Sequence, residues 1–262
     1  GFPAMGIKGA AIATAIAEYA GVVFGLFIIW KLRGNFKTMP GLKAILRAKF
    51  SPYLQSIRLG INAAFEDFTW NFGNLMLIRI LNTISDLAAG IYTVIFSVEI
   101  IVVFIMCSIG DGTLTLSGEA KGRDDLKQFK GVGKVAYMLS ASVSFVLLLL
   151  CIFMPEQLIA VFTDEEYIIT GCNLFLLIAG VNLFSKAANI IIGNCIRGSG
   201  NTKWMFCTQI LGTIMVVSFA SLFVYRFGMG IAGVFLAVLL DEFIRAIINF
   251  TKLVAITRKW EA

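Results

Sequence analysis

The sequence has few charged residues and no histidine. Charged side chains make up 15% of its 262 residues and hydrophobic ones 58%, whereas soluble domains carry about 25% charged residues. The mean hydropathy is +0.87. A soluble globule of this size would expose much of this apolar surface to water, so the composition excludes a soluble enzyme, a nucleic-acid-binding module and a disordered chain. It indicates an all-α polytopic membrane protein that has the lipid bilayer as its partner.

The lack of histidine removes the usual general base, proton shuttle and zinc ligand. There is no HExxH motif and no ATP-binding motif, so we expect neither an enzyme nor a primary pump, and no metal or cofactor. The five cysteines form no CxxC pair and lie in or beside apolar runs, which is typical of buried structural thiols. Because the chain begins with glycine and shows no signal peptide, we expect a fragment or a processed product.

Seven apolar runs are long enough to cross a bilayer, which takes about 20 apolar residues in a helix. They lie near residues 9–30, 54–81, 87–109, 132–153, 167–192, 204–225 and 230–251. The second and seventh runs are the weakest, because both carry charged residues. The pattern therefore predicts seven transmembrane helices.

Charge in the connections between these runs alternates. The first, third and fifth connections and the C-terminal tail hold 16 basic residues. In the even-numbered connections the one basic residue is Arg226. The fourth connection, residues 155–166, has four acidic residues and no basic one. Basic loops lie on the cytoplasmic side of plasma membranes. We therefore expect the N-terminal end outside the cell and the C-terminus in the cytoplasm, and we ascribe most of the net charge of +6 to this orientation signal.

An internal repeat argues against an independent seven-helix receptor. Residues 5–18, MGIKGAAIATAIAE, match residues 229–242, MGIAGVFLAVLLDE, at six of fourteen positions. Each copy opens a span that runs from outside to inside. The simplest account is that each closes one lobe of a two-lobed protein, in the manner of parallel transporter repeats.

Two motifs carry a resemblance to a known family. The first is the run GIKGAAIAT at residues 6–14, with Gly6 and Gly9, and the second is RGSGNT at residues 197–202, with Arg197, Gly198 and Gly200. Both are similar to motifs of multidrug and toxic compound extrusion (MATE) transporters, although Asn201 stands where the family has aspartate. The glycine- and charge-rich run at residues 117–125 is a weaker match. The chain thus resembles helices six to twelve of a twelve-helix, two-lobed transporter.

The resemblance implies a domain organisation. Residues 1–30 would be the last helix of the N-terminal lobe, 31–52 a basic cytoplasmic linker, 53–256 the C-terminal six-helix lobe and 257–262 a cytoplasmic tail. A missing N-terminal lobe would be the main protein partner, and we expect a monomer. A lobe without its counterpart leaves its cavity wall exposed, so we expect that the fragment alone does not transport.

Ionisable residues at mid-membrane depth are costly unless they face water or a partner, which makes them candidate functional residues. On the second span Asn62, Glu66, Thr69, Trp70 and Gly73 follow a helical spacing and form one polar stripe that would suit a water-filled cavity. In the resembled family an acidic residue of the seventh helix couples cation binding to export, and the resemblance assigns this role to Glu66. Asp67 lies beside it, and repulsion between the two carboxylates would favour uptake of a proton, a sodium ion or a cationic substrate. The alternative is that Asn, Thr or Arg neighbours satisfy these carboxylates.

A second polar stripe lies on the fifth span. It consists of Asn182, Lys186, Asn189 and Gly193. Some members of the resembled family have an acidic residue in this helix, and Lys186 stands there instead, which weakens the case for a two-carboxylate sodium site. Lys186 could form an ion pair with Glu66 or Glu99, or extend to water.

Further polar groups lie on the third and seventh spans. Glu99 and Tyr92 share a face of the third span and are candidates for coupling and for the cavity wall. On the seventh span Arg245 is spaced to pair locally with Asp241 and Glu242. The motif glycines Gly198 and Gly200 are expected to stop a helix by adopting a left-handed conformation, with Arg197 beside them as a basic anchor at the lipid headgroups.

The leading hypothesis is a secondary antiporter that exports organic cations or other amphipathic compounds, including drugs, in exchange for protons or sodium ions by alternating access. An excess of acidic residues at membrane depth suits a cationic substrate. A flippase for a lipid-linked oligosaccharide is the alternative, and it would favour a basic cavity. A seven-helix receptor or sensor is a third possibility that the repeat disfavours.

Overall fold

The computed structural model describes residues 5–32 and 50–261, and within these ranges every regular element is a helix. In chain order they are α1 (Gly6–Lys31), α3 (Phe50–Ile84), α4 (Asp86–Gly122), α5 (Leu126–Phe153), α6 (Pro155–Ala160), α7 (Glu166–Gly171), α8 (Asn173–Gly198), α9 (Thr202–Ser221), the π-helical turn η1 (Leu222–Arg226) and α10 (Gly230–Glu261). The predicted all-α class is confirmed, and each of the seven apolar runs lies mostly on one long helix, although the run 167–192 begins on the short α7.

Five helices of the described part are long and apolar enough to cross a membrane: α1 from Ala11 to Lys31, α4, α5, α8, and α9 together with η1. The other two long helices, α3 and α10, have 35 and 32 residues. They carry the charged residues that weakened the second and seventh runs in the sequence.

Helix ends differ from the limits of the apolar runs. α4 continues to Gly122, 13 residues past the predicted limit, and α5 begins at Leu126, so the predicted loop 111–134 is mostly helix. The reason is that polar residues can prolong a helix beyond the bilayer. The side chains of Ser85 and Asp125 cap the starts of α4 and α5. The fourth connection also contains α6, and α8 begins six residues later than the run 167–192.

The chain divides into two units, Gly1–Gln55 and Ser56–Ala262. In the first unit α1 is a single apolar helix whose described side chains are almost all exposed. The predicted linker 31–52 falls mostly on residues 33–49, which lie outside the described residues.

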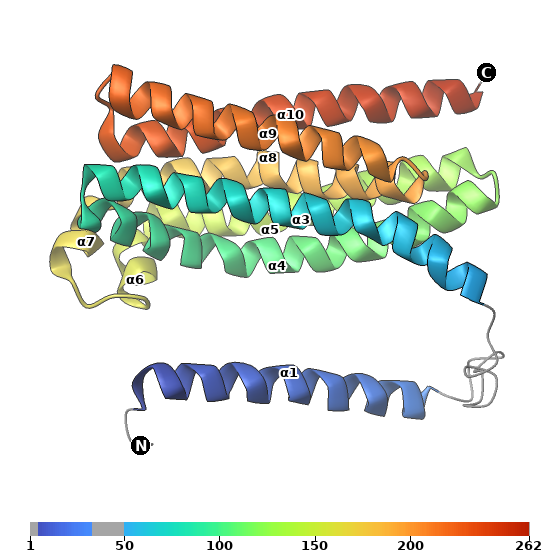
Figure 1. The fold of residues 1–262 in the computed structure, drawn as a ribbon, viewed down its shortest axis with the longest axis horizontal. Coiled ribbons are helices and arrows are strands. Elements are labelled where there is room, and N and C mark those ends of the chain that lie inside the picture. Colours follow the sequence, from blue (N-terminus) through green and yellow to red (C-terminus); the bar gives the residue numbers. More distant parts are fainter. Residues whose placement is uncertain (1–4, 33–49, 262) are drawn as a thin grey trace. The chain divides into compact units, whose positions relative to one another are not determined.

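The second unit is a helical bundle with α8 at its centre. α4, α5 and α10 pack against α8, and α9 packs against α10 (Figure 1). Its main core contains Leu81, Ile95, Met106, Leu183 and Val234, all with less than 2% of their surface exposed. α3 is joined to the bundle largely by side-chain contacts, including the hydrogen bond between Asn62 and Thr202 and the ring contact between Phe65 and Phe206.

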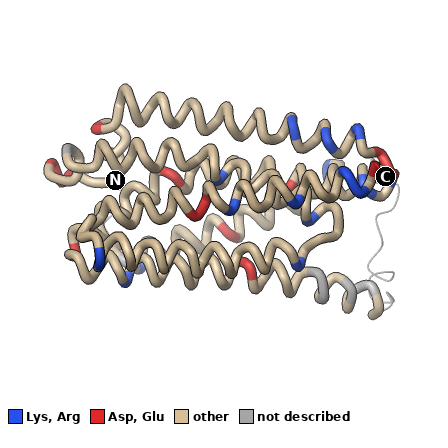
Figure 2. The backbone as a smooth tube through the Cα atoms, turned by 90° about the horizontal axis from the view of Figure 1, so that it is seen from above, with Lys and Arg blue, Asp and Glu red and all other residues tan. Residues whose placement is uncertain are grey.

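The connections of the bundle alternate between its two ends. The α4–α5 and α8–α9 turns lie at the end where the C-terminus lies, and the α3–α4 turn, α6 and α7 lie at the other (Figure 1). Basic residues gather toward the C-terminal end, while several acidic residues lie partway along the helices (Figure 2). The charge alternation counted in the sequence therefore corresponds to two opposite ends of this unit.

Candidate functional site

A cavity of about 620 Å³ lies within the second unit, between α3, α4, α8, α9 and α10. Its wall is mixed: aromatic and aliphatic side chains such as Trp70, Tyr92 and Phe96 alternate with charged ones. The acidic side chains of the wall are Glu66, Asp67, Asp111, Asp241 and Glu242, and the basic ones are Lys186, Arg197 and Arg245. Acidic groups thus outnumber basic groups, and the cavity can hold water or a polar ligand among the helices.

The first ion pair of the cavity joins α3 and α8. Arg197 Nη2 contacts Glu66 Oε1, and only 11% of the Glu66 side chain is exposed. Arg197 Nη1 also donates a 3.0 Å hydrogen bond to Asn194 Oδ1, which fixes the guanidinium toward the cavity. Besides the expected role of Arg197 as a basic anchor beside the turn, the structure gives it a carboxylate partner inside the bundle. Its long side chain reaches back along α8 to the carboxylate, which agrees with the alternative that neighbours satisfy Glu66.

The second ion pair joins α4 and α8. Lys186 Nζ lies 2.7 Å from Glu99 Oε2, with 14% and 10% of the two side chains exposed. The sequence left Glu66 and Glu99 as possible partners of Lys186, and in the structure Lys186 pairs with Glu99. Glu99 is buried in this pair and is not among the cavity-lining residues.

The third charged group lies on α10. Arg245 Nη2 is 2.7 Å from Glu242 Oε1 and 3.1 Å from Asp241 Oδ2, so one guanidinium serves two carboxylates, as the spacing predicts. A Cβ on Gly212 would lie 2.8 Å from Asp241 Oδ1, so the glycine lets α9 approach this group closely. Asp241 Oδ1 and Arg245 Nε are buried and have no hydrogen-bond partner among the described residues. The group carries two acids and one base.

Hydrogen bonds extend this group across four helices. In order along the chain of bonds, the partners are Trp204, Asn249, Asn189, Glu242, Arg245, Gln209, Thr213 and the carbonyl of Thr69. Asn189 Nδ2 donates to Glu242 Oε2 at 2.7 Å and to the Glu242 carbonyl at 2.8 Å. The network links α9, α10, α8 and α3, so a change of charge at one member would disturb hydrogen bonds on all four.

Sequence reasoning missed several members of this network. Gln209, Thr213, Trp204 and Asn249 were not proposed as site residues. A usable signal was present on α10, where Asp241, Arg245 and Asn249 follow one another at intervals of four residues, and Asn249 is fully buried. The stripe on α8 also continues from Gly193 to Arg197 at the same spacing.

The cavity contains some of the predicted wall residues and not others. Trp70, Tyr92 and Asn189 line it, together with Glu66, Asp67 and Lys186. Asn62, Thr69 and Asn182 do not. The Asn62 amide donates to Thr202, the Thr69 hydroxyl donates 2.7 Å to the Phe65 carbonyl of its own helix, and Asn182 is buried inside the bundle. A helical stripe is wider than the part of it that faces the cavity.

Asp67 and Asp111 are the exposed carboxylates of the wall. Neither is in an ion pair within residues 5–32 and 50–261, and both lie near Cys107. Unlike Glu66, each of these wall carboxyl groups is without a basic partner among the described side chains.

The motif glycines have two different roles. Gly200, two residues past the end of α8, has φ +91°, as expected for a helix-stopping glycine. Gly198 is the last residue of α8 and does not have a positive φ, so that expectation is wrong for it. A Cβ on Gly198 would lie 2.9 Å from the Leu114 carbonyl, so this glycine allows α4 and α8 to pack closely. In the N-terminal motif, Gly6 has φ +53°, and Gly9 lies against Met5.

A bundle of long apolar helices around a charged cavity defines a polytopic membrane protein. The sequence model of the MatE family matches residues 63–222, which is more than half of the chain, and the chain belongs to this family.

The chain is similar over its whole length to "Probable multidrug resistance protein NorM" of Thermotoga maritima, with 28% identity over 262 residues that make up 55% of that protein. It is 23% identical to "Uncharacterized transporter YisQ" of Bacillus subtilis, over 96% of this chain and 55% of the relative. The chain therefore spans about half the length of these relatives.

Solved structures share the fold. An outward-facing multidrug resistance MATE family transporter of the MOP superfamily aligns with a TM-score of 0.86 and 17% identity, over 98% of this chain and 58% of that one. A MOP superfamily transporter from Pyrococcus furiosus, described as having a binding pocket of reverse polarity, aligns with a TM-score of 0.83 and 18% identity, over the same shares of the two chains.

Proposed function

We propose that this chain is the C-terminal part of a secondary antiporter that exports organic cations, in exchange for protons or sodium ions moving inward. The observation that carries the proposal is the cavity in which five acidic side chains face three basic ones. In this proposal a cationic substrate binds near Asp67 and Asp111 against the aromatic rings of the wall, where both charge and cation–π attraction favour it. The names of the two relatives, a probable multidrug resistance protein and an uncharacterized transporter, support the same class.

Coupling is assigned to the pair of Glu66 and Arg197. When Glu66 takes up a proton it loses its attraction for Arg197, and α3 and α8 lose a contact that joins them across the cavity. Because α3 is held to the bundle mainly by side chains, loss of this pair would favour a different position of α3. Two lobes would then rock about the shared cavity and expose it to each side in turn.

The flippase alternative requires a cavity that attracts a lipid-linked pyrophosphate. Each basic side chain of the wall contacts a carboxylate, so none of the three is left to bind an anion. The receptor alternative has no feature in its favour beyond the number of spans. No enzymatic step or cofactor is proposed; the protein would act as a monomer in the plasma membrane with its C-terminus in the cytoplasm.

The test is export from vesicles that contain the complete protein, driven by an imposed ion gradient. We expect Glu66→Gln to abolish coupled export of a cationic dye, while Glu156→Gln, an exposed acidic residue of α6 outside the cavity, leaves it unchanged. Coupled export at the wild-type rate in Glu66→Gln would show the coupling assignment to be wrong. Transport of an anionic lipid-linked sugar in place of the dye would favour the flippase.

A further inference from the structure

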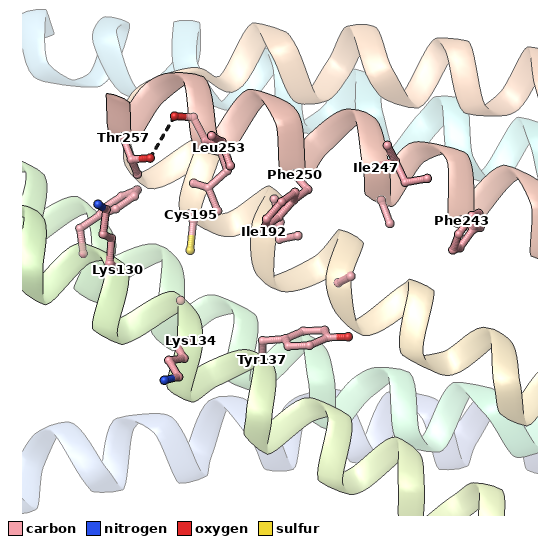
Figure 3. Close-up of a pocket in the computed structure, with 15 residues that line it drawn as sticks. Lys130, Lys134, Tyr137, Ile192, Cys195, Phe243, Ile247, Phe250, Leu253 and Thr257 are labelled. Carbon is pink, nitrogen blue, oxygen red and sulfur yellow. Dashed lines mark hydrogen bonds between the residues drawn. The ribbon is translucent and has the colours of Figure 1, made fainter. Parts of the chain in front are cut away.

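A second hollow lies on the opposite side of α8 and α10 from the charged cavity. It is a groove of about 550 Å³ between α5, α8 and α10 (Figure 3). On α10 its wall is formed by Phe243, Ile247 and Phe250, which remain 50–56% exposed. These residues alternate along α10 with Asp241, Arg245 and Asn249 of the cavity network. The groove is thus an exposed apolar hollow on helices whose other face is polar.

The groove has a basic end. Lys130 and Lys134 lie on α5 at the end of the groove where Thr257 of α10 also lies, while Phe243 lies at the other end (Figure 3). Lys134 is in no ion pair within the described part of the chain, and Lys130 pairs with Glu261 at an exposed position. An exposed ion pair of this kind contributes little to stability, so another anion can replace the Glu261 carboxylate beside Lys130.

Aromatic contacts at the basic end are of the kind found at a membrane–water interface. The rings of Phe129, which lines the groove, and Trp260 lie 5.3 Å apart edge to face. Lys121 Nζ sits 3.6 Å from the centre of the Trp260 ring, and the Trp260 indole donates to Asp124. Tryptophan with neighbouring lysines is typical of the headgroup level of a bilayer.

The groove also has the length of one lipid chain. From Phe243 to Thr257 the helix rises about 21 Å, which is somewhat more than one leaflet of a hydrocarbon core about 30 Å thick. An acyl chain laid against this wall therefore places its phosphate near the two lysines. Basic pockets between transmembrane helices at the cytoplasmic level are sites for acidic lipid headgroups.

We propose that this groove binds one anionic phospholipid. Its acyl chain lies against Phe243, Ile247 and Phe250, and its phosphate lies between Lys130 and Lys134. The absence of an acidic wall residue in the groove favours a headgroup with net negative charge over a zwitterionic one. The other lobe is a less suitable occupant, because the charged cavity that it would share lies on the opposite face of α8 and α10.

The first test uses native mass spectrometry of the complete protein in detergent, with phosphatidylglycerol and phosphatidylcholine of the same chains as probes. We expect one retained phosphatidylglycerol and weak retention of phosphatidylcholine. In Lys130→Ala/Lys134→Ala the dissociation constant for phosphatidylglycerol should rise about fivefold per lysine removed. The matched control Lys127→Ala/Lys203→Ala removes two exposed lysines that do not line the groove. Equal weakening in the control, or no retained phosphatidylglycerol, would overturn the proposal.

The second test separates a lipid from a bare phosphate site. Ala246→Phe fills the groove, whereas Val146→Phe adds the same ring at an exposed position of α5 outside it. We expect the first variant to lose the bound lipid and the second to keep it. Soluble glycerol phosphate should not displace the lipid from the wild type. Retention in Ala246→Phe, or displacement by glycerol phosphate, would contradict a site that holds the acyl chain.

Discussion

Three basic side chains, Lys186, Arg197 and Arg245, each contact a carboxylate inside the second unit. At the residue scale the charged positions at membrane depth were visible in the sequence, because such residues are rare in apolar runs. Their partners were only partly predictable. Pairs within α10 follow from helix spacing. The pairing of Lys186 with Glu99 and of Arg197 with Glu66 depends instead on how α3, α4 and α8 pack against one another. The residue spacing within a single helix does not predict that packing.

We predict that Lys186 and Glu99 stabilise the fold as a pair. Lys186→Met and Glu99→Gln should each lower the stability of the bundle by about 3 kcal/mol, because each leaves a buried charge without its partner. The double variant should be much less destabilised than the sum of the two. Unfolding of the purified protein in detergent measures all three variants, and strictly additive effects would contradict the pairing.

Substitution of Arg245 should destabilise the protein more than substitution of Lys186. Arg245→Met leaves both Asp241 and Glu242 without a cation and deprives Gln209 of its donor, so we expect a loss of at least about 3–5 kcal/mol in the same unfolding measurement. Adding Asp241→Asn and Glu242→Gln should recover part of that loss. The control Arg79→Met, at an exposed position of α3, should change stability by less than about 0.5 kcal/mol.

At the element scale, apolar runs predict which segments are helices, but not where the helices end. α4 and α5 extend past the apolar part, since Lys, Arg and Glu have helix propensities close to that of Leu. The same limit affects the polar stripes. Asn62, Glu66 and Thr69 share a face of α3, yet of these three only Glu66 reaches the cavity wall. The Asn62 amide donates to Thr202 of α9, and the Thr69 hydroxyl donates to a carbonyl of its own helix.

The close approach of α4 and α8 depends on Gly198. We expect Gly198→Ala to destabilise the bundle by about 1–3 kcal/mol, because the new methyl group would collide with the Leu114 carbonyl and the Ser117 side chain. Gly112→Ala, also in a helix but with open space around it, should be neutral or slightly stabilising. Melting temperatures in detergent compare the two, and equal effects would show that the contact is unimportant.

At the scale of the whole molecule, loop charge predicts which connections share an end, and the second unit places them accordingly. This part of the fold was predictable because basic residues gather on one side of a membrane irrespective of how the helices pack. The hydrogen-bond network of the cavity was not predictable from the sequence. Its members Gln209, Asn189 and Asn249 come together only after three helices have packed against one another.

The same charge pattern predicts how the protein lies in the cell membrane. Glu156 and Lys127 are exposed residues near opposite ends of α5, whose 28 residues rise about 42 Å, more than the hydrocarbon core. In a variant with its native cysteines replaced by alanine, Glu156→Cys should react with a membrane-impermeant maleimide in intact cells. Lys127→Cys should react only after the membrane is permeabilised. The reverse pattern would invert the orientation and place the lipid groove's lysines in the outer leaflet.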